Sequence, residues 1–291
     1  MPKRLPSGDK IAALRDAGDV TGLIEAFEAT KRRDRRHATR VAVEALGDDG
    51  RTALMDLLGD EHWQRSAGAV LVELGEETFP AIATQLESDE ELRRRGALHA
   101  VYLYARYRDL PAAHELLRAV AAGEEAPDLA EPATRMAERV EQLGRLRNEE
   151  IDRQLARMKA STERDDGGST FMRMYSRVHR ERMEARLSIN SMRFAGVRHV
   201  IEVAPQFGGV AVAALLSLGM EELRGDVVPI IEESLRSDDR RRRSLLLSAL
   251  ICLRRARVPG AAEALERDGV DITLEMDRRA ARIYTRWVRE R

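Results

Sequence analysis

Residues 49–75, DGRTALMDLLGDEHWQRSAGAVLVELG, contain the pattern that decides the fold. Apolar side chains recur at helical spacing over 49–58 and again over 60–74, and a short break separates the two segments. The second segment ends on Leu74-Gly75, just as an earlier one ends on Leu46-Gly47, 28 residues before. Glycine suits the left-handed position that closes a helix. The stretch therefore predicts a pair of helices that recurs along the chain.

Similar helix pairs are expected over most of the sequence. In the N-terminal half they cover about 19–47, 49–75, 78–104 and 111–144, and three more fit between 195 and 291. A pair of about 28 to 35 residues is too small to bury its own apolar face, so neighbouring pairs must cover it. We therefore predict an all-α fold, an alpha-alpha superhelix or α-solenoid of stacked antiparallel helix pairs.

Composition favours the same fold class. Hydrophobic residues make up 43% of the chain but aromatic residues only 4%, so the core must consist mainly of Ala, Leu, Val and Ile. Such side chains suit helices that pack closely together. Few stretches alternate between apolar and polar residues with period two, which argues against a β-rich architecture.

Several of the expected pairs resemble units of the HEAT-repeat family in its short-repeat form. The resemblance rests on residues 22–27 with 36–47, on 53–54 with 65–69, and on 227–231 with 243–253. An Asp precedes an Arg by five residues at three places, which is similar to the Asp and Arg that tie neighbouring HEAT units together: Asp60/Arg65, Asp89/Arg94 and Asp238/Arg243. The resemblance covers about residues 10–144 and 195–291.

The pattern divides the chain into N-terminal repeats (1–144), a charged, Met-rich helical insert (145–192) and C-terminal repeats (193–291). Residues 161–169 have little to bury and include two adjacent glycines, so we expect a mobile loop there. Methionine adapts to a partner surface but also fills irregular cores, and both alternatives stay open for the helix that follows. If it is a contact, the partner should touch Met172, Met174, Tyr175 and Met183.

The sequence contains no recognisable catalytic, metal or nucleotide motif. Its six histidines include no pair at metal-ligand spacing, and it has no Gly-Lys-Ser/Thr phosphate loop. Cys252, the only cysteine, lies in the apolar run 250–253, which predicts a buried, inert thiol. We therefore expect no metal, no cofactor and no catalytic residue, and we favour a function other than catalysis.

Charge is distributed unevenly along a chain whose net charge is only -1. Residues 48–144 carry 10 basic and 20 acidic side chains, whereas residues 235–291 carry 15 and 9. The basic C-terminal part includes Arg240 and Arg241, and helical spacing places Arg278, Arg282 and Arg286 on one face. These arginines predict contact with an anionic partner, which is either an acidic protein or a nucleic acid.

Nucleic-acid binding is the second hypothesis, because some HEAT-like proteins are DNA glycosylases that hold a duplex on a basic concave surface, with an Asp and tryptophans at the lesion. The C-terminal arginines lie beside Trp287, one of only two tryptophans in the chain. Against this hypothesis, the acidic segment 48–144 would repel a duplex laid along the whole solenoid.

The preferred hypothesis is a binding scaffold or adaptor that presents an extended helical-repeat surface to another protein. Residues 210–218 are apolar nearly all round, which predicts burial on several sides and also raises the idea of a homodimer. No stretch is long and apolar enough to span a bilayer, and residues 1–17 lack the apolar run of a signal peptide, so the cytoplasm is expected.

Overall fold

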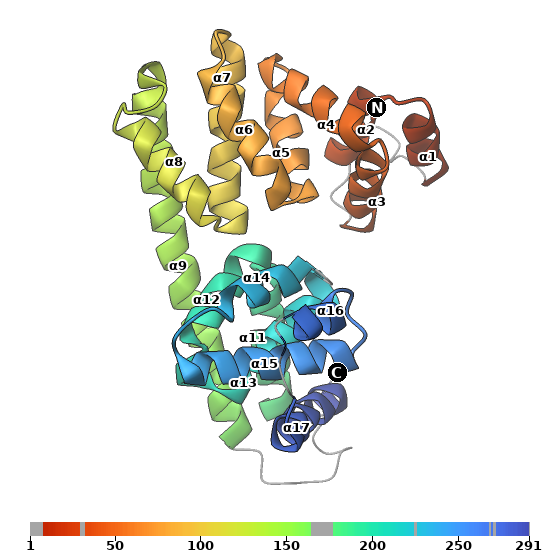
Figure 1. The fold of residues 1–291 in the computed structure, drawn as a ribbon, viewed down its shortest axis with the longest axis vertical. Helices are drawn as coiled ribbons and strands as arrows, with labels where there is room; N and C mark the ends of the chain where they lie inside the picture. The colour runs from red at the N-terminus through yellow and green to blue at the C-terminus, as the bar shows by residue number, and fades with distance from the viewer. Residues whose placement is uncertain are drawn as a thin grey trace. The chain divides into compact units, whose positions relative to one another are not determined.

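The computed structural model of the chain consists of helices joined by short connections (Figure 1). It describes residues 8–29, 33–163, 177–223, 226–267, 269 and 272–290. These residues include no strand, so the all-α prediction is confirmed. They form two compact units, residues 1–142 and 143–291, and the boundary between the units falls within the long helix α9 (Ala130–Glu163).

The described residues of unit 1 contain eight short α-helices and the first part of α9. The helices are α1 (Gly8–Asp16), α2 (Val20–Glu28), α3 (Arg33–Glu44), α4 (Gly47–Asp56), α5 (Gln64–Leu74), α6 (Phe79–Thr84), α7 (Glu91–Leu103) and α8 (Pro111–Ala121). The pair expected at 49–75 is α4, extended by the 3-10 turn η1 (Leu57–Gly59), followed by α5. Helix α1 precedes the first expected pair and buries Ile11 against the unit.

Two local signals in the sequence have the predicted effect in unit 1. The carboxylate of Asp19 accepts a hydrogen bond from the backbone N–H of Gly22 at 2.8 Å and so caps the start of α2. Gly47 has a φ of 59°, which is the left-handed conformation expected where a helix closes. The chain therefore reverses at these points because of local side-chain and backbone preferences.

The second helices of neighbouring pairs approach each other closely through small side chains. A Cβ atom built on Gly68 of α5 would lie 3.3 Å from the Cβ of Ala100 in α7. At Gly96 of α7 the approach is closer, because a Cβ atom there would lie 2.1 Å from the carbonyl oxygen of Leu58. Only glycine fits at residue 96, so this position sets how tightly α7 packs on η1.

Donors from the turn after α7 satisfy the carbonyls at the end of α5. This turn is the π-helical segment η4 (Tyr104–Arg108). The Tyr104 hydroxyl donates towards the carbonyls of Leu71 and Gly75, at 2.9 and 2.6 Å, and Arg108 Nε donates to the carbonyl of Val72 at 2.6 Å. Tyr104 is fully buried, and this burial raises the pKa of its phenol. The last carbonyls of a helix lack partners within the helix, so these donors connect consecutive pairs.

The described residues of unit 2 contain the remainder of α9 and seven further α-helices. They are α11 (Arg177–Ser191), α12 (Arg193–Phe207), α13 (Gly209–Ser217), α14 (Val227–Ser234), α15 (Arg240–Arg255), α16 (Ala261–Arg267) and α17 (Leu274–Glu290). A π-helical turn, η6 (Leu218–Glu222), follows α13. Among all described helices of the chain, none combines the length and the apolar composition needed to cross a membrane.

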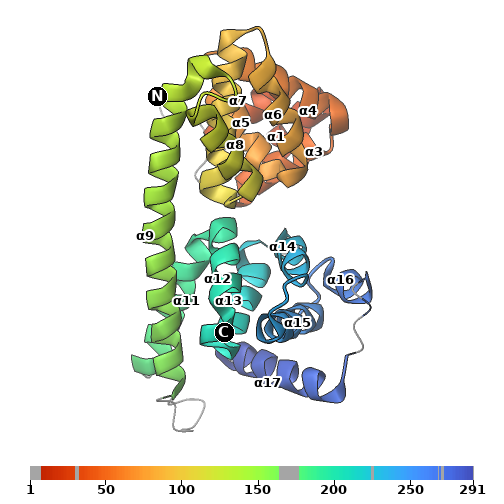
Figure 2. The same ribbon diagram turned by 60° about the vertical axis from the view of Figure 1, so that its left-hand side comes forward.

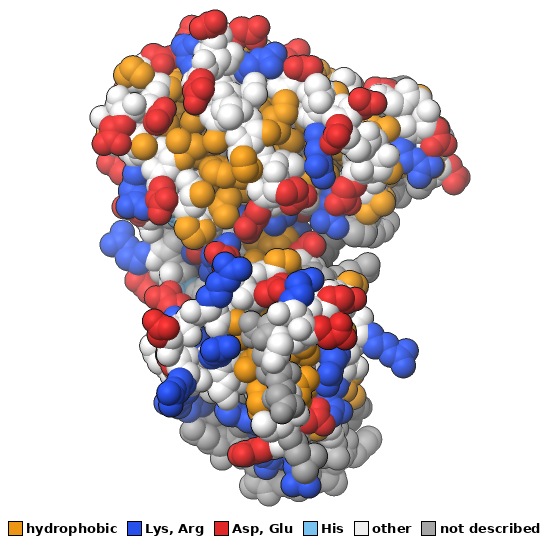
Figure 3. Space-filling model, in the orientation of Figure 1, with side chains coloured by type: hydrophobic (Ala, Val, Ile, Leu, Met, Phe, Trp, Pro, Cys, Tyr) orange, Lys and Arg blue, Asp and Glu red, His pale blue; other side chains and the backbone are white. Residues whose placement is uncertain are grey.

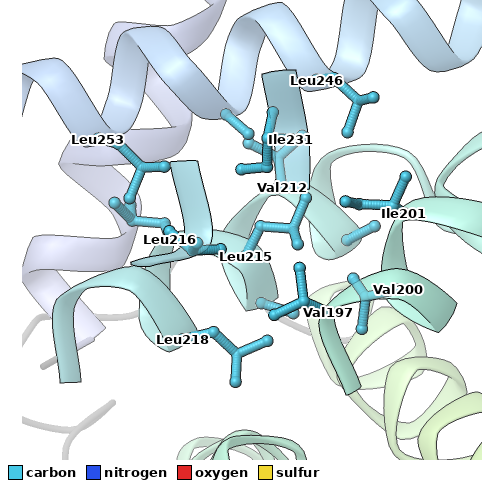
Figure 4. Close-up of a cluster of buried hydrophobic side chains, with 14 of the residues drawn as sticks. Val197, Val200, Ile201, Val212, Leu215, Leu216, Leu218, Ile231, Leu246 and Leu253 are labelled. Atoms are coloured by element: carbon cyan, nitrogen blue, oxygen red, sulfur yellow. The ribbon is translucent and has the colours of Figure 1, made fainter. Parts of the chain in front are cut away.

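Helix α13 is the centre of the unit 2 core. It packs against α11, α12, α15 and α17, and Figure 4 shows Val212, Leu215 and Leu216 among side chains from the neighbouring helices. The predicted burial of the apolar run 210–218 is confirmed, since most of its side chains belong to this core. The suggested homodimer therefore loses its basis, because these side chains already pack inside their own unit.

The segment expected to be an insert contributes to the same core. Ile151, Leu155 and Met158 of α9 and Ala185 and Ile189 of α11 are all buried in it. Arg182 of α11 adds a buried link, because its guanidinium donates to the hydroxyl and the carbonyl of Ser161, at 3.1 and 3.0 Å. The described part of 145–192 is thus a structural element of unit 2. The loop expected at 161–169 lies mostly outside the described residues.

The last helix departs from a simple stack of pairs. Arg255 pairs with Asp277 at 2.6 Å, and the Cys252 thiol donates to the carbonyl of Ala280 at 3.4 Å, so the first half of α17 packs across the C-terminal part of α15. Figure 2 shows α17 lying along one side of α15 and α13. A regular solenoid would place equivalent helices parallel to each other. The solenoid of stacked pairs remains a prediction.

Replacing Tyr104 by Phe tests the cap on α5. The variant leaves the carbonyls of Leu71 and Gly75 with one donor fewer in a buried place, so we expect unit 1 to lose about 1–3 kcal/mol of its free energy of unfolding. Hydrogen exchange of unit 1 peptides measures this loss. Tyr107→Phe is the matched control, because that side chain is exposed, and it should change stability by less than about 0.5 kcal/mol. Equal effects would contradict the cap.

Candidate partner-binding surface

The structure places the predicted methionine contacts only in part. Met172, Met174 and Tyr175 lie outside the described residues. Met183 lies on α11 and is half-buried. Its neighbours Arg182 and Arg186 are buried, so this part of α11 faces the interior of unit 2.

Arg240 and Arg241 begin α15 and are exposed. The preceding residue, Asp239, caps this helix by accepting hydrogen bonds from the backbone N–H groups of Arg241 and Arg242, at 2.9 and 3.1 Å. The carboxylate offsets part of the positive charge at this helix end. None of the described contacts joins Arg240 or Arg241 to the arginines of α17.

Helix α17 separates its side chains sharply between two faces. Arg278, Arg282 and Arg286 are exposed on one face, as the spacing predicts, and we name them the C-terminal arginine stripe. The opposite face carries Ala280, which is fully buried, and Trp287, which is 3% exposed. The helix is thus attached to unit 2 by its apolar face and presents guanidinium groups to solvent.

Several contacts hold the stripe in place. Asp277 pairs with Arg255 at 2.6 Å and lies 3.9 Å from Arg254, which fastens the first turn of α17 to the end of α15. Near the other end, the guanidinium of Arg186 lies 5.8 Å from the ring centroid of Trp287, and both side chains are buried. The stripe therefore lies on a helix that is fixed at both ends, which reduces the conformational entropy lost on binding.

The stripe differs electrostatically from other arginines of unit 2. Arg198 pairs with Glu233 at 3.0 Å, and hydrogen bonds from Arg267 lower the pKa of the Glu232 carboxyl. By contrast, no described carboxylate pairs with Arg278 or Arg282. An anionic partner could therefore bind these two guanidinium groups without displacing a carboxylate of the described residues.

A polar hollow of about 320 Å³ lies between α12 and α14, lined by Arg198, Ile201, Glu202, Glu233, Ser234, Ser237 and Arg242. Its arginines are already engaged, because Arg198 pairs with Glu233 and Arg242 donates to the carbonyl of Glu202 at 3.3 Å. The hollow therefore offers little uncompensated charge to a ligand.

The described residues include no group of three or more His, Cys, Asp or Glu side chains that could hold a metal ion. The predicted burial of Cys252 is confirmed, and this burial raises the pKa of its thiol to about 12; the inertness of the thiol remains a prediction. No family model matches the sequence, and neither a curated protein nor a solved structure matches it.

The residues that support the stripe were only partly predictable from the sequence. Trp287 is adjacent to Arg286 in the sequence, but its side chain is buried against Arg186. The burial of Trp287 could have been predicted from the sequence, because Ala280, Ile283, Tyr284 and Trp287 recur at i, i+3, i+4 and i+7 and so form one apolar face. The contact between Trp287 and Arg186 could not be predicted from local sequence, because the two residues are 101 positions apart.

The reactivity of Cys252 follows from its burial. At pH 8 we expect iodoacetamide to leave the native protein unmodified, because the thiolate is scarce and the sulfur is inaccessible. The same reagent should add one label per chain in denaturant. Mass spectrometry measures both outcomes, and stoichiometric labelling of the native protein would show that the thiol is accessible.

Proposed function

We propose that this chain is a non-enzymatic binding scaffold or adaptor, and that the C-terminal arginine stripe contacts an acidic segment of a partner protein. One observation carries the proposal: Arg278 and Arg282 are exposed on a well-anchored helix and have no carboxylate partner among the described residues. A location in the cytoplasm and a relationship to HEAT-repeat scaffolds form part of the same proposal.

The dimensions of the stripe suit a short acidic segment. Three arginines at i, i+4 and i+8 span about 12 Å along a helix, because each residue adds about 1.5 Å. Guanidinium groups bind carboxylates through paired hydrogen bonds and are less strongly hydrated than ammonium groups. Two or three carboxylates spaced along one face of a partner helix would match this length.

Nucleic acid is the second candidate, because phosphates would also bind unpaired arginines. Two observations make it the weaker one. Trp287 is only 3% exposed, so it is not positioned to stack on a base. Residues 48–144 carry twice as many acidic as basic side chains, which disfavours a long polyanion.

The test compares two variants with the same change in net charge. Replacing Arg278, Arg282 and Arg286 by Gln removes the stripe, whereas replacing Arg135, Arg139 and Arg145 by Gln removes three exposed arginines of α9. Tagged proteins are used to capture partners from a lysate of the source organism, after nuclease treatment and at two salt concentrations. We expect a defined protein to bind the wild type and the α9 variant but not the stripe variant.

With that protein purified, loss of the stripe should weaken binding about tenfold, because three exposed ion pairs contribute about 0.5 kcal/mol each. It should also flatten the dependence of affinity on salt. Equal affinity of both variants would refute the assignment of the stripe. Capture that nuclease abolishes would favour nucleic acid instead.

A further inference from the structure

A row of aromatic and basic side chains follows one face of α7 in unit 1. Arg95, His99, Tyr102 and Arg106 occur at i, i+4, i+7 and i+11, so they lie above one another along the helix. The rings of His99 and Tyr102 are 5.9 Å apart, and Arg106 donates a hydrogen bond to the Tyr102 hydroxyl at 3.1 Å. The side chains therefore form a connected surface.

The π-helical turn η4 adds a second aromatic ring to this surface. The guanidinium carbon of Arg106 lies 5.9 Å from the centroid of Tyr102 and 4.8 Å from that of Tyr107. Tyr107 is 49% exposed, whereas Tyr102 is only 7% exposed, so Tyr107 presents its ring to a partner and Tyr102 supports Arg106. Turns of π-helix are uncommon and occur frequently at functional sites. Here the turn arranges two tyrosines around one arginine.

The local charge of this surface is positive. Arg65 of α5 is exposed, and it lies close enough to His99 to act on its imidazole. Burial and the Arg65 charge both lower the pKa of His99, so the imidazole is neutral at pH 7. Arg95 pairs with Glu91 at 2.6 Å, but no described carboxylate pairs with Arg65 or Arg106.

A purely structural role does not account for this surface. Tyr104 and Arg108, from the same turn, already satisfy the carbonyls of α5 and are buried. Arg106 and Tyr107 make no such link to a neighbouring helix among the described contacts. Tyrosine and arginine dominate the energetically important positions of protein interfaces, where they combine apolar area with polar groups.

We propose that Arg65, His99, Tyr102, Arg106 and Tyr107, the α7 cluster, form a second docking site that binds an acidic peptide segment of a partner protein. A carboxylate of the segment pairs with Arg106, a second carboxylate pairs with Arg65, and an apolar or aromatic side chain lies against the ring of Tyr107. The site is in unit 1 and shares no residue with the C-terminal arginine stripe. It therefore stands even if the stripe has another role.

The charge of unit 1 favours a short peptide over a nucleic acid, because residues 48–144 carry 20 acidic and 10 basic side chains. On the face of unit 1 shown in Figure 3, acidic side chains border an apolar area over α6 and α8. Two exposed acids of unit 1 have no basic partner among the described residues: Glu87 of the 3-10 turn η3 (Gln85–Glu87) and Glu115 of α8. A nucleic acid carries a charge on every nucleotide and would extend from the cluster onto acidic surface, whereas a peptide places its charges only at the arginines.

The experiment uses the full chain in which Arg278, Arg282 and Arg286 are already replaced by Gln, so that binding to the stripe cannot contribute. The probes are an array of 15-residue peptides that carry two to four Asp or Glu residues, with and without a Tyr or Phe. We expect the best peptides to contain both acidic and aromatic residues, and fluorescence anisotropy gives their dissociation constants.

In this background, Arg106→Gln should weaken binding of those peptides about tenfold, as expected for loss of a hydrogen bond between charged groups. Tyr107→Ala should weaken it severalfold, whereas Tyr107→Phe should retain it because the ring remains. Arg95→Gln is the matched control and should leave affinity unchanged, since Arg95 is already paired with Glu91. Circular dichroism confirms that the variants are folded.

Three outcomes would overturn the proposal. The first is that no acidic peptide binds, or that Arg106→Gln and Arg95→Gln have equal effects. The second is that a 15-nucleotide single strand binds more tightly than every peptide and competes for the same residues. The third is that light scattering shows a dimer of the chain that Arg106→Gln dissociates, which would identify a second copy as the occupant.

Discussion

The hydrogen bonds from the turn after α7 to the end of α5 determine which side chains of that turn are buried in unit 1 and which lie at its surface. The last carbonyls of α5 need donors from outside their own helix. Tyr104 and Arg108 provide them because η4 is wound as a π-helix and directs both side chains inward. The same five-residue turn leaves Arg106 and Tyr107 at the surface. One local distortion thus completes the core and builds the α7 cluster.

Close packing gives this arrangement its rigidity. With few aromatic residues, the core depends on short distances between backbones, and Gly68 and Gly96 allow α7 to approach α5 and η1. A surface that lies on helices packed in this way loses little conformational entropy when a partner binds. The close packing that Gly68 and Gly96 allow therefore holds the large exposed side chains of α7 and η4 in a fixed arrangement for binding.

Unit 2 also presents arginine side chains on a well-packed helix, but its helices are arranged differently. Its central helix, α13, is covered on several sides, and α17 crosses α15 and α13 instead of extending a regular stack. This crossing buries Trp287 and leaves the arginines of α17 exposed. Elsewhere in the unit arginines pair with glutamates, as Arg267 does with Glu232. Arg278 and Arg282 in unit 2, and Arg65 and Arg106 in unit 1, have no such carboxylate partner among the described residues, and this is the common property of the two surfaces to which we assign binding.

The amino-acid sequence by itself determined the helical class, the end of α3 near Gly47, the capping of α2 by Asp19 and the burial of 210–218, because each follows from local preference or periodicity. The row from Arg95 to Arg106 was also readable from spacing, although sequence analysis did not single it out. Only the tertiary structure decided that α17 crosses α15 and that Ile151, Leu155 and Met158 belong to the core of unit 2. It also decided that Arg108 is buried while Arg106 is not. These features depend on contacts between residues far apart in the chain, such as Arg186 with Trp287, and local pattern does not encode which distant helix covers a given face.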